Sequence, residues 1–347
     1  MKLWMSKDGK DGHGIRYCME NARGLMVEIS TLGAAITQVV MPDKNGVRKN
    51  VCLSLADAKA YHGNGLYAGA TVAPVAGRIG GGKFKIGNKE YQATINSGGH
   101  CLHGGENSAS FCEWKLLQVA EHDTYATVAM LLHLPDGLDG FPGNRTFMAC
   151  YTLDEQSRLQ VSYKAVSDQD TYVNMTNHSY FNLSGDFGSS AMNQIMTVAA
   201  DAYFELDECY LPGERVEVKG TCMDFSRGRR LQDVLEHGKE RGIDHAFDVR
   251  RTAKTGKRVA ELFSLTSGCG VRIKSPTAQC VVVYTGGFMD GSWVVENQGE
   301  TTKAGKFCAV ALECQAFPNA INRPDLKPEI LKTGETYRHE IVYEFLF

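Results

Sequence analysis

Hydrophobic and polar residues alternate along much of this chain. Residues 25–30, 83–87, 125–130 and 158–163 each place apolar side chains at about every second position. Because successive side chains of a β-strand point to opposite faces, this pattern predicts strands with one buried and one solvated face. Turn sequences rich in Gly, Asn, Asp and Pro separate these segments at short intervals, which is typical of antiparallel hairpins.

Two other segments are apolar at nearly every position. Residues 279–285 and 307–313 are predicted to form strands buried on both faces. The second segment ends on Glu313, and a carboxylate that closes an apolar strand is either a member of an ion pair or a base in a pocket. Partial desolvation would raise the pKa of Glu313 toward a value useful for proton abstraction.

Helical periodicity is rare in this sequence. Residues 231–235 and 56–61 are predicted to form short helices. The strand–helix alternation of a doubly wound sheet is absent, so the pattern predicts an antiparallel sandwich or barrel. No low-complexity linker or clear internal repeat divides the 347 residues, and we expect one all-β domain over residues 1–347.

Composition and charge indicate which classes of partner and which cellular compartment to expect. The net charge of −3 gives no reason to expect nucleic acid or an anionic membrane as partner. No stretch approaches the ~18 apolar residues of a membrane span, and residues 1–10 lack the apolar region of a signal peptide. The eleven cysteines include no C-x-x-C pair, so we expect reduced thiols and a cytoplasmic protein.

The segment 176–185 holds the densest group of candidate catalytic side chains. It combines His178 with Asn177, Asn182, several hydroxyls and two aromatic rings. An imidazole with a pKa of about 6.5 can donate or accept a proton at neutral pH. Such a mixture suits a concave site that binds a polyhydroxylated ligand and transfers a proton. The alternative is a strand end whose polar side chains only satisfy backbone groups.

Two glycine-rich segments supply further candidates. Arg78 lies between Gly77 and three more glycines, where its guanidinium could bind hydroxyls or a carboxylate. That loop lacks the spacing of a phosphate-binding loop, and a hairpin with a solvated Arg is the alternative. His100 and His103 raise the question of a metal, but no third and fourth ligands follow at usable spacing, so no metal is expected. His103 could instead project into a pocket as a hydrogen-bond donor or second acid.

Asp244 follows a turn, and it completes a set of one Arg, two His, one Asp and one Glu. The sequence offers no nucleophile motif and no cofactor fingerprint beside this set. These side chains together suit proton transfer on a neutral, hydroxyl-rich molecule.

On these segments the chain resembles the aldose 1-epimerase (galactose mutarotase) family, from about residue 24 to the C-terminus. An ordered series of motifs is more specific than any single tetrapeptide. The matching motifs are the glycine-arginine loop at 69–84, L-H-G-G at 102–105, P-D-G at 135–137 with G-F-P-G at 140–143, N-H-S-Y-F-N-L at 177–183, I-D-H at 243–245, Y-T-G at 284–286 and E-C-Q-A-F-P-N-A at 313–320.

The resemblance implies a large antiparallel β-sandwich, the galactose mutarotase-like supersandwich, with a few short helices. It implies a cofactor-independent isomerase that interconverts the α- and β-anomers of a free aldose such as glucose or galactose. Glu313 matches the general base and His178 the general acid, with His103 assisting at the ring oxygen. The expected partner is a small-molecule sugar, and the expected assembly is a monomer or homodimer. The side chains expected to bind the sugar are Arg78, Asp244 and Asn177.

The chain also departs from the family pattern. Gly77 stands where members commonly have Asn, Val282 where many carry Gln, and Pro74 where part of the family has Arg. The loss of these hydrogen-bonding side chains alters how the site recognises the hydroxyl groups of a sugar. Two alternatives are a non-catalytic carbohydrate-binding protein on the same fold and a relative acting on hexose 6-phosphates. The second would need a basic cluster such as residues 227–230 near the pocket.

Overall fold

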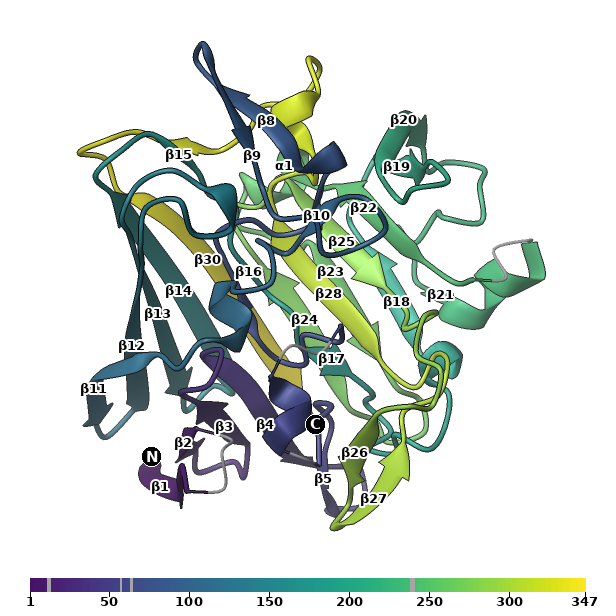
Figure 1. The fold of residues 1–347 in the computed structure, drawn as a ribbon. Coiled ribbons are helices and arrows are strands. Elements are labelled where there is room, and N and C mark those ends of the chain that lie inside the picture. The colour runs from purple at the N-terminus through teal and green to yellow at the C-terminus, as the bar shows by residue number, and fades with distance from the viewer. Residues whose placement is uncertain (11–13, 57, 63–64, 238–240) are drawn as a thin grey trace.

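Antiparallel sheets dominate the computed structural model, which describes residues 1–10, 14–56, 58–62, 65–237 and 241–347 (Figure 1). The largest sheet has nine strands and contains the strands predicted from alternation at 125–130 and 158–163. In sheet order its strands are β11 (Lys115–Glu121), β12 (Tyr125–Leu134), β13 (Arg145–Asp154), β14 (Arg158–Ser167), β30 (Tyr337–Leu346), β24 (Gly270–Lys274), β23 (Ala260–Phe263), β18 (Ile195–Val198) and β21 (Arg229–Arg230).

A six-stranded sheet packs against one face of the nine-stranded sheet, and its β28 and β25 cross in front of β24 and β23 in Figure 1. Its strands, in sheet order, are β17 (Tyr180–Phe181), β28 (Val310–Gln315), β25 (Cys280–Tyr284), β22 (Asp244–Asp248), β19 (Ala202–Leu206) and β20 (Pro212–Glu217). The sandwich predicted from the sequence is confirmed.

Smaller sheets extend the sandwich. A five-stranded sheet near the N-terminus runs β1 (Lys2–Asp8), β2 (Ile15–Glu20), β3 (Met26–Ser30), β4 (Ala35–Pro42) and β5 (Arg48–Asn50). The two-stranded pairs are β6 (Thr71–Val72) with β16 (Thr176–Asn177), β7 (Arg78–Ile79) with β10 (Cys101–Leu102), β8 (Lys83–Ile86) with β9 (Lys89–Gln92), β15 (Thr171–Tyr172) with β29 (Ile330–Leu331), and β26 (Val294–Asn297) with β27 (Glu300–Lys303).

The helices of the described residues are short. The helix predicted at 231–235 is confirmed as the 3₁₀ helix η6. The helix predicted at 56–61 is confirmed over 58–61 as the 3₁₀ helix η1, while residue 57 lies outside the described residues. No helix among the described residues has both the length and the apolar composition to cross a membrane. The helices are η1 (Ala58–Tyr61), η2 (Gly80–Gly82), η3 (Ala109–Phe111), η4 (Leu138–Gly140), η5 (Ala191–Asn193), η6 (Leu231–His237), η7 (Ala320–Asn322) and the α-helix α1 (Arg250–Ala253).

The six-stranded sheet separates the main core from a cavity on its other face. On β25, Val281 and Val283 are fully buried in the main core, whereas Val282 and Tyr284 line the cavity. Both strands predicted to be buried on two faces are confirmed, because every residue of β28 is buried and β25 is buried at all positions except Tyr284. The expected strand end at Glu313 is wrong, since β28 continues to Gln315 and holds the carboxylate inside the strand.

Candidate active site

A cavity of about 500 Å³ opens on the outer face of the six-stranded sheet. Five of the six predicted site residues line it, although they come from segments far apart in the sequence. Those five residues are Arg78, His103, His178, Asp244 and Glu313.

His178 enters the cavity at the junction of two short strands. β16 pairs with β6, and β17 pairs with β28 through Tyr180 opposite Ala311. The backbone N–H of His178 donates to the carbonyl of Ala70 at 2.9 Å, which fixes the junction between them. The polar segment 176–185 therefore crosses from one sheet to another and leaves its imidazole beside β28.

Arg78 and His103 reach the cavity from a neighbouring hairpin. Arg78 on β7 pairs with Leu102 on β10, so His103 follows at the end of the same ladder. The backbone of His103 has a φ of 50°, a left-handed conformation, and it turns the imidazole inward before the two following glycines. The sequence prediction that His103 projects from a turn agrees with this geometry.

His178 and Glu313 form a closely spaced buried pair. The Nε2 atom of His178 lies 3.5 Å from Oε1 of Glu313, and both side chains are almost fully buried. Burial lowers the pKa of His178 to about 4. Burial also raises the pKa of Glu313 well above its ordinary range; the charge of Asp244 adds to this rise and Arg78 opposes it. Both shifts favour a neutral imidazole beside a neutral carboxyl.

Three polar atoms at this site have no hydrogen-bond partner among the described residues. They are Nδ1 of His178, Oε2 of Glu313 and Nε2 of Gln315, and all three residues line the cavity. Buried polar groups are nearly always paired in native proteins, because leaving one unpaired costs about 1–3 kcal/mol. Their convergence on one cavity is the arrangement expected where a hydroxyl-rich ligand completes the network.

Aromatic rings pack around the two histidines. The ring of His103 meets that of His178 edge-on, with centroids 5.2 Å apart. Tyr67 contacts the ring of His103 at 4.6 Å, and Tyr180 contacts that of His178 at 4.8 Å. These contacts limit the rotation of both imidazoles and hold the cavity in shape without a ligand.

His103, His178 and Glu313 place one potential metal-binding atom each within 4.8 Å of one another. The backbone N–H of Gly77, however, donates to Nδ1 of His103 at 3.2 Å. That bond makes Nδ1 the acceptor and leaves the proton of the neutral ring on Nε2. Neither nitrogen of His103 then offers a free lone pair, so the geometry fits a hydrogen-bond donor better than a metal ligand.

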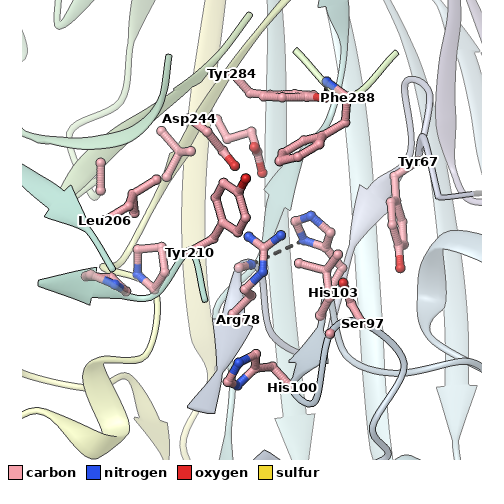
Figure 2. A pocket seen from close by; sticks show the side chains of 18 of the residues that line it. Tyr67, Arg78, Ser97, His100, His103, Leu206, Tyr210, Asp244, Tyr284 and Phe288 are labelled. Atoms are coloured by element: carbon pink, nitrogen blue, oxygen red, sulfur yellow. Dashed lines mark hydrogen bonds between the residues drawn. The ribbon is translucent and has the colours of Figure 1, made fainter. Parts of the chain in front are cut away.

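Arg78 provides the positive charge of the cavity. Figure 2 shows its guanidinium between the rings of Tyr210 and His103, and its central carbon lies 5.3 Å from the Tyr210 ring centroid. Burial raises the pKa of Asp244 to about 6, and the charge of Arg78 opposes that rise. Asp244 is therefore an acceptor whose charge depends on pH near neutrality.

Asn177 is a correction to the predicted set. Its amide nitrogen donates to the carbonyl of Gly69 at 2.8 Å, and its oxygen accepts from the backbone N–H of Ser179 at 3.1 Å. The residue is fully buried and does not line the cavity. Its amide fixes the backbone next to His178, which corresponds to the strand-end alternative for this one residue.

Sequence reasoning missed several residues that line the cavity. Gln315 was within reach of prediction, because it stands two residues after Glu313 and so shares its face of the strand. The aromatic wall offers no such signal, since tyrosines are equally common in cores. The other aromatic rings at the cavity belong to Tyr67, Tyr180, Tyr210, Tyr284 and Phe288, and further polar side chains in its lining are Asn96, Ser97, His100, Glu208 and Cys209.

Comparison with known proteins identifies the family of this chain. The sequence profile of the family described as aldose 1-epimerase matches residues 16–344. A galactose mutarotase from Sus scrofa is 35% identical over 322 residues, covering 92% of this chain and 91% of its own length. An aldose 1-epimerase from Streptococcus thermophilus is 30% identical over 350 residues, covering 99% of each chain.

Solved structures show the same fold. An aldose epimerase homologue from C. elegans superposes with a TM-score of 0.85 at 27% identity, covering 95% of this chain and 98% of the other. A galactose 1-epimerase from Lactobacillus acidophilus gives a TM-score of 0.82 at 28% identity, covering 99% and 98%. With the profile match along nearly its whole length, the chain belongs to the aldose 1-epimerase family of isomerases.

Proposed function

We propose that this aldose 1-epimerase opens and recloses the ring of a free aldose with Glu313 as general base and His178 as general acid. The observation that carries the proposal is the pair itself, a carboxylate oxygen and an imidazole nitrogen 3.5 Å apart inside a cavity. The two groups can therefore contact adjacent oxygen atoms of one hemiacetal. Their unpaired atoms, Oε2 and Nδ1, support a role in a wider polar network.

Ring opening needs one proton removed and one supplied. Glu313, as carboxylate, takes the proton of the anomeric hydroxyl, and the C1–O1 bond becomes a carbonyl. The electron pair of the C1–O5 bond moves to the ring oxygen, which receives a proton from the imidazolium of His178. Rotation about C1–C2 presents the other face of the carbonyl. Reclosure reverses both transfers and gives the other anomer, so the enzyme returns to its starting protonation state.

The electrostatics of the pair favour this cycle. A charged Glu313–His178 pair and a neutral pair contain the same number of protons, so the two forms differ only in where one proton sits. Burial favours the neutral form, as the directions of both pKa shifts indicate. During ring opening Glu313 gains a proton and His178 loses one, so both groups become neutral. The low polarity of the site therefore assists that step.

The remaining polar side chains would bind the sugar. The Nε2–H of His103 is available to donate toward the ring oxygen, because Nδ1 is already occupied by Gly77. Arg78 and Asp244, which also line the cavity, would supply donors and an acceptor. Gln315 adds a free amide nitrogen.

A free aldose suits the cavity better than a sugar phosphate. Arg78 is the one Lys or Arg among the described residues that line it, and no residue of the basic run 227–230 is among them. A phosphate normally needs several donors or cations.

We also propose that the active protein is a monomer or a homodimer, and that each chain carries a complete site. A cytoplasmic location is supported by all eleven cysteines being free.

Polarimetry of freshly dissolved α-D-glucose and α-D-galactose tests the mechanism. Relaxation should accelerate with wild-type protein, and Glu313→Gln or His178→Asn should reduce the acceleration by about 10²–10⁴-fold. Glu335→Gln and His133→Asn, at exposed positions, serve as matched controls. Retained activity in both cavity variants would refute the assignment. Sugar binding without any acceleration in the wild type would favour the carbohydrate-binding alternative.

A further inference from the structure

The wall of the cavity next to Glu313 is apolar. Val282 on β25 lies directly opposite Glu313 on β28, and Ala246 on β22 lies directly opposite Val282. Paired residues of antiparallel strands point to the same face with their Cβ atoms about 4.5–5.5 Å apart, so the three side chains form one row. All three line the cavity, and Val282 and Ala246 are 8% and 3% exposed.

The row of Glu313, Val282 and Ala246 lies in line with His178 across neighbouring strands of the sheet. The strand order β17–β28–β25 places β17, which follows His178, on one side of Glu313 and Val282 on the other. If His178 protonates the ring oxygen and Glu313 binds the anomeric hydroxyl, the sequence of atoms O5, C1, C2 runs from His178 across Glu313. The C2 position then faces Val282 and Ala246.

We propose that this chain prefers aldoses without a hydroxyl at C2, the 2-deoxyaldoses, over aldoses that carry one. This inference rests on the proposed function and names the substrate class of the same site. A hydroxyl at C2 would lose its water and meet two hydrocarbon side chains, whereas a methylene at C2 makes favourable contact there. Many family members carry Gln at the position of Val282, and Val cannot supply that amide.

Neighbouring polar groups lie in other rows of the sheet. Asp244 is paired with Tyr284, and Gln315 with Cys280, so each is displaced by two residues along its strand. Two residues of an extended strand span about 7 Å, which places these groups opposite other parts of the sugar.

Gly77 cannot replace the missing amide either. It stands where the family commonly has Asn, but a Cβ added there would lie 2.7 Å from Cβ of Pro318. The chain thus lacks two hydroxyl-binding side chains of its family, and the packing of Pro318 prevents the return of one of them.

The test compares sugars that differ by one hydroxyl. The acceleration, as kcat/KM divided by the spontaneous rate of the same sugar, is measured for 2-deoxy-D-galactose and D-galactose. D-Fucose, which lacks the hydroxyl at C6 instead, is the positional control. Wild-type protein should prefer 2-deoxy-D-galactose over D-galactose by about 10- to 100-fold, the range by which an apolar pocket disfavours an added hydroxyl.

Val282→Gln should reverse this preference and leave the ratio of D-fucose to D-galactose unchanged. Val282→Thr keeps the shape of Val, and it should shift the C2 ratio in the same direction by less. A wild-type preference for D-galactose over its 2-deoxy form would overturn the inference. So would an equal shift of the C2 and C6 ratios in both variants. If no sugar is accelerated and Glu313→Gln changes nothing, the proposed function itself fails and the inference with it.

Discussion

Gly77 allows a quantitative test of how tightly the cavity wall is packed. Its φ is +76°, a conformation that costs an L-residue about 1–2 kcal/mol. A Cβ added to it would lie 2.7 and 2.9 Å from Cβ and Cγ of Pro318, and overpacking of this kind costs about 1–3 kcal/mol more. Gly77→Ala should therefore lower the free energy of unfolding by about 2–5 kcal/mol.

Gly81 is the matched control for Gly77. Its φ is +60°, but no heavy atom lies within 4 Å of an added Cβ, so Gly81→Ala carries the backbone cost alone. Unfolding in urea, with the midpoint and slope of each variant, gives both free energies. Pro318→Gly removes the two closest atoms, and in that background the extra cost of Gly77→Ala should disappear. Equal costs at Gly77 and Gly81, or an extra cost that survives in that background, would refute the packing argument.

Two further predictions concern stability. Asn177→Ala should destabilise the fold by about 1–3 kcal/mol, because it leaves the buried backbone N–H of Ser179 without its acceptor, while KM changes little; an increase in KM without loss of stability would contradict this assignment. Burial lowers the pKa of His339 to about 4, so below pH 6.5 the unfolded chain takes up a proton that the folded chain does not. Stability should thus fall by about 2 kcal/mol for this group between pH 7 and pH 5. Urea titrations of His339→Gln should show a weaker pH dependence than wild type, and an unchanged dependence would count against a buried neutral imidazole.

Strand prediction succeeded where the side-chain period alone determines the structure. The segment 158–163 lies within β14, whose core-facing side chains alternate with exposed or half-buried ones. Local periodicity is sufficient there because each strand buries one face. The end of β28 was mispredicted for a related reason. Glu313 interrupts an apolar run, but the strand continues because the charged side chain points into the cavity rather than into the core.

In the candidate site too, some residues could be predicted from local sequence, whereas others depend on tertiary contacts. His178, Glu313 and Arg78, which line the cavity, could be singled out from the sequence because their residue types are unusual in their local surroundings. Asn177 was misplaced because an amide that binds a sugar and one that binds a backbone carbonyl look alike in sequence, and only the tertiary contact with Gly69 separates them. The partners of Val282 across the sheet depend on strand register, which is set by packing between distant segments.

The two faces of β25 have different evolutionary freedom. Val281 and Val283 are buried in the main core, so substitutions there lower the stability of the fold regardless of which sugar is bound. Val282 and Tyr284, at the intervening positions, line the cavity and can vary with much less consequence for the scaffold. A lineage could therefore acquire a new sugar by point substitutions at alternate positions of neighbouring strands while retaining its acid–base pair. The same spacing defines a compact library for redesign, in which cavity-facing positions are randomised and core-facing ones are kept.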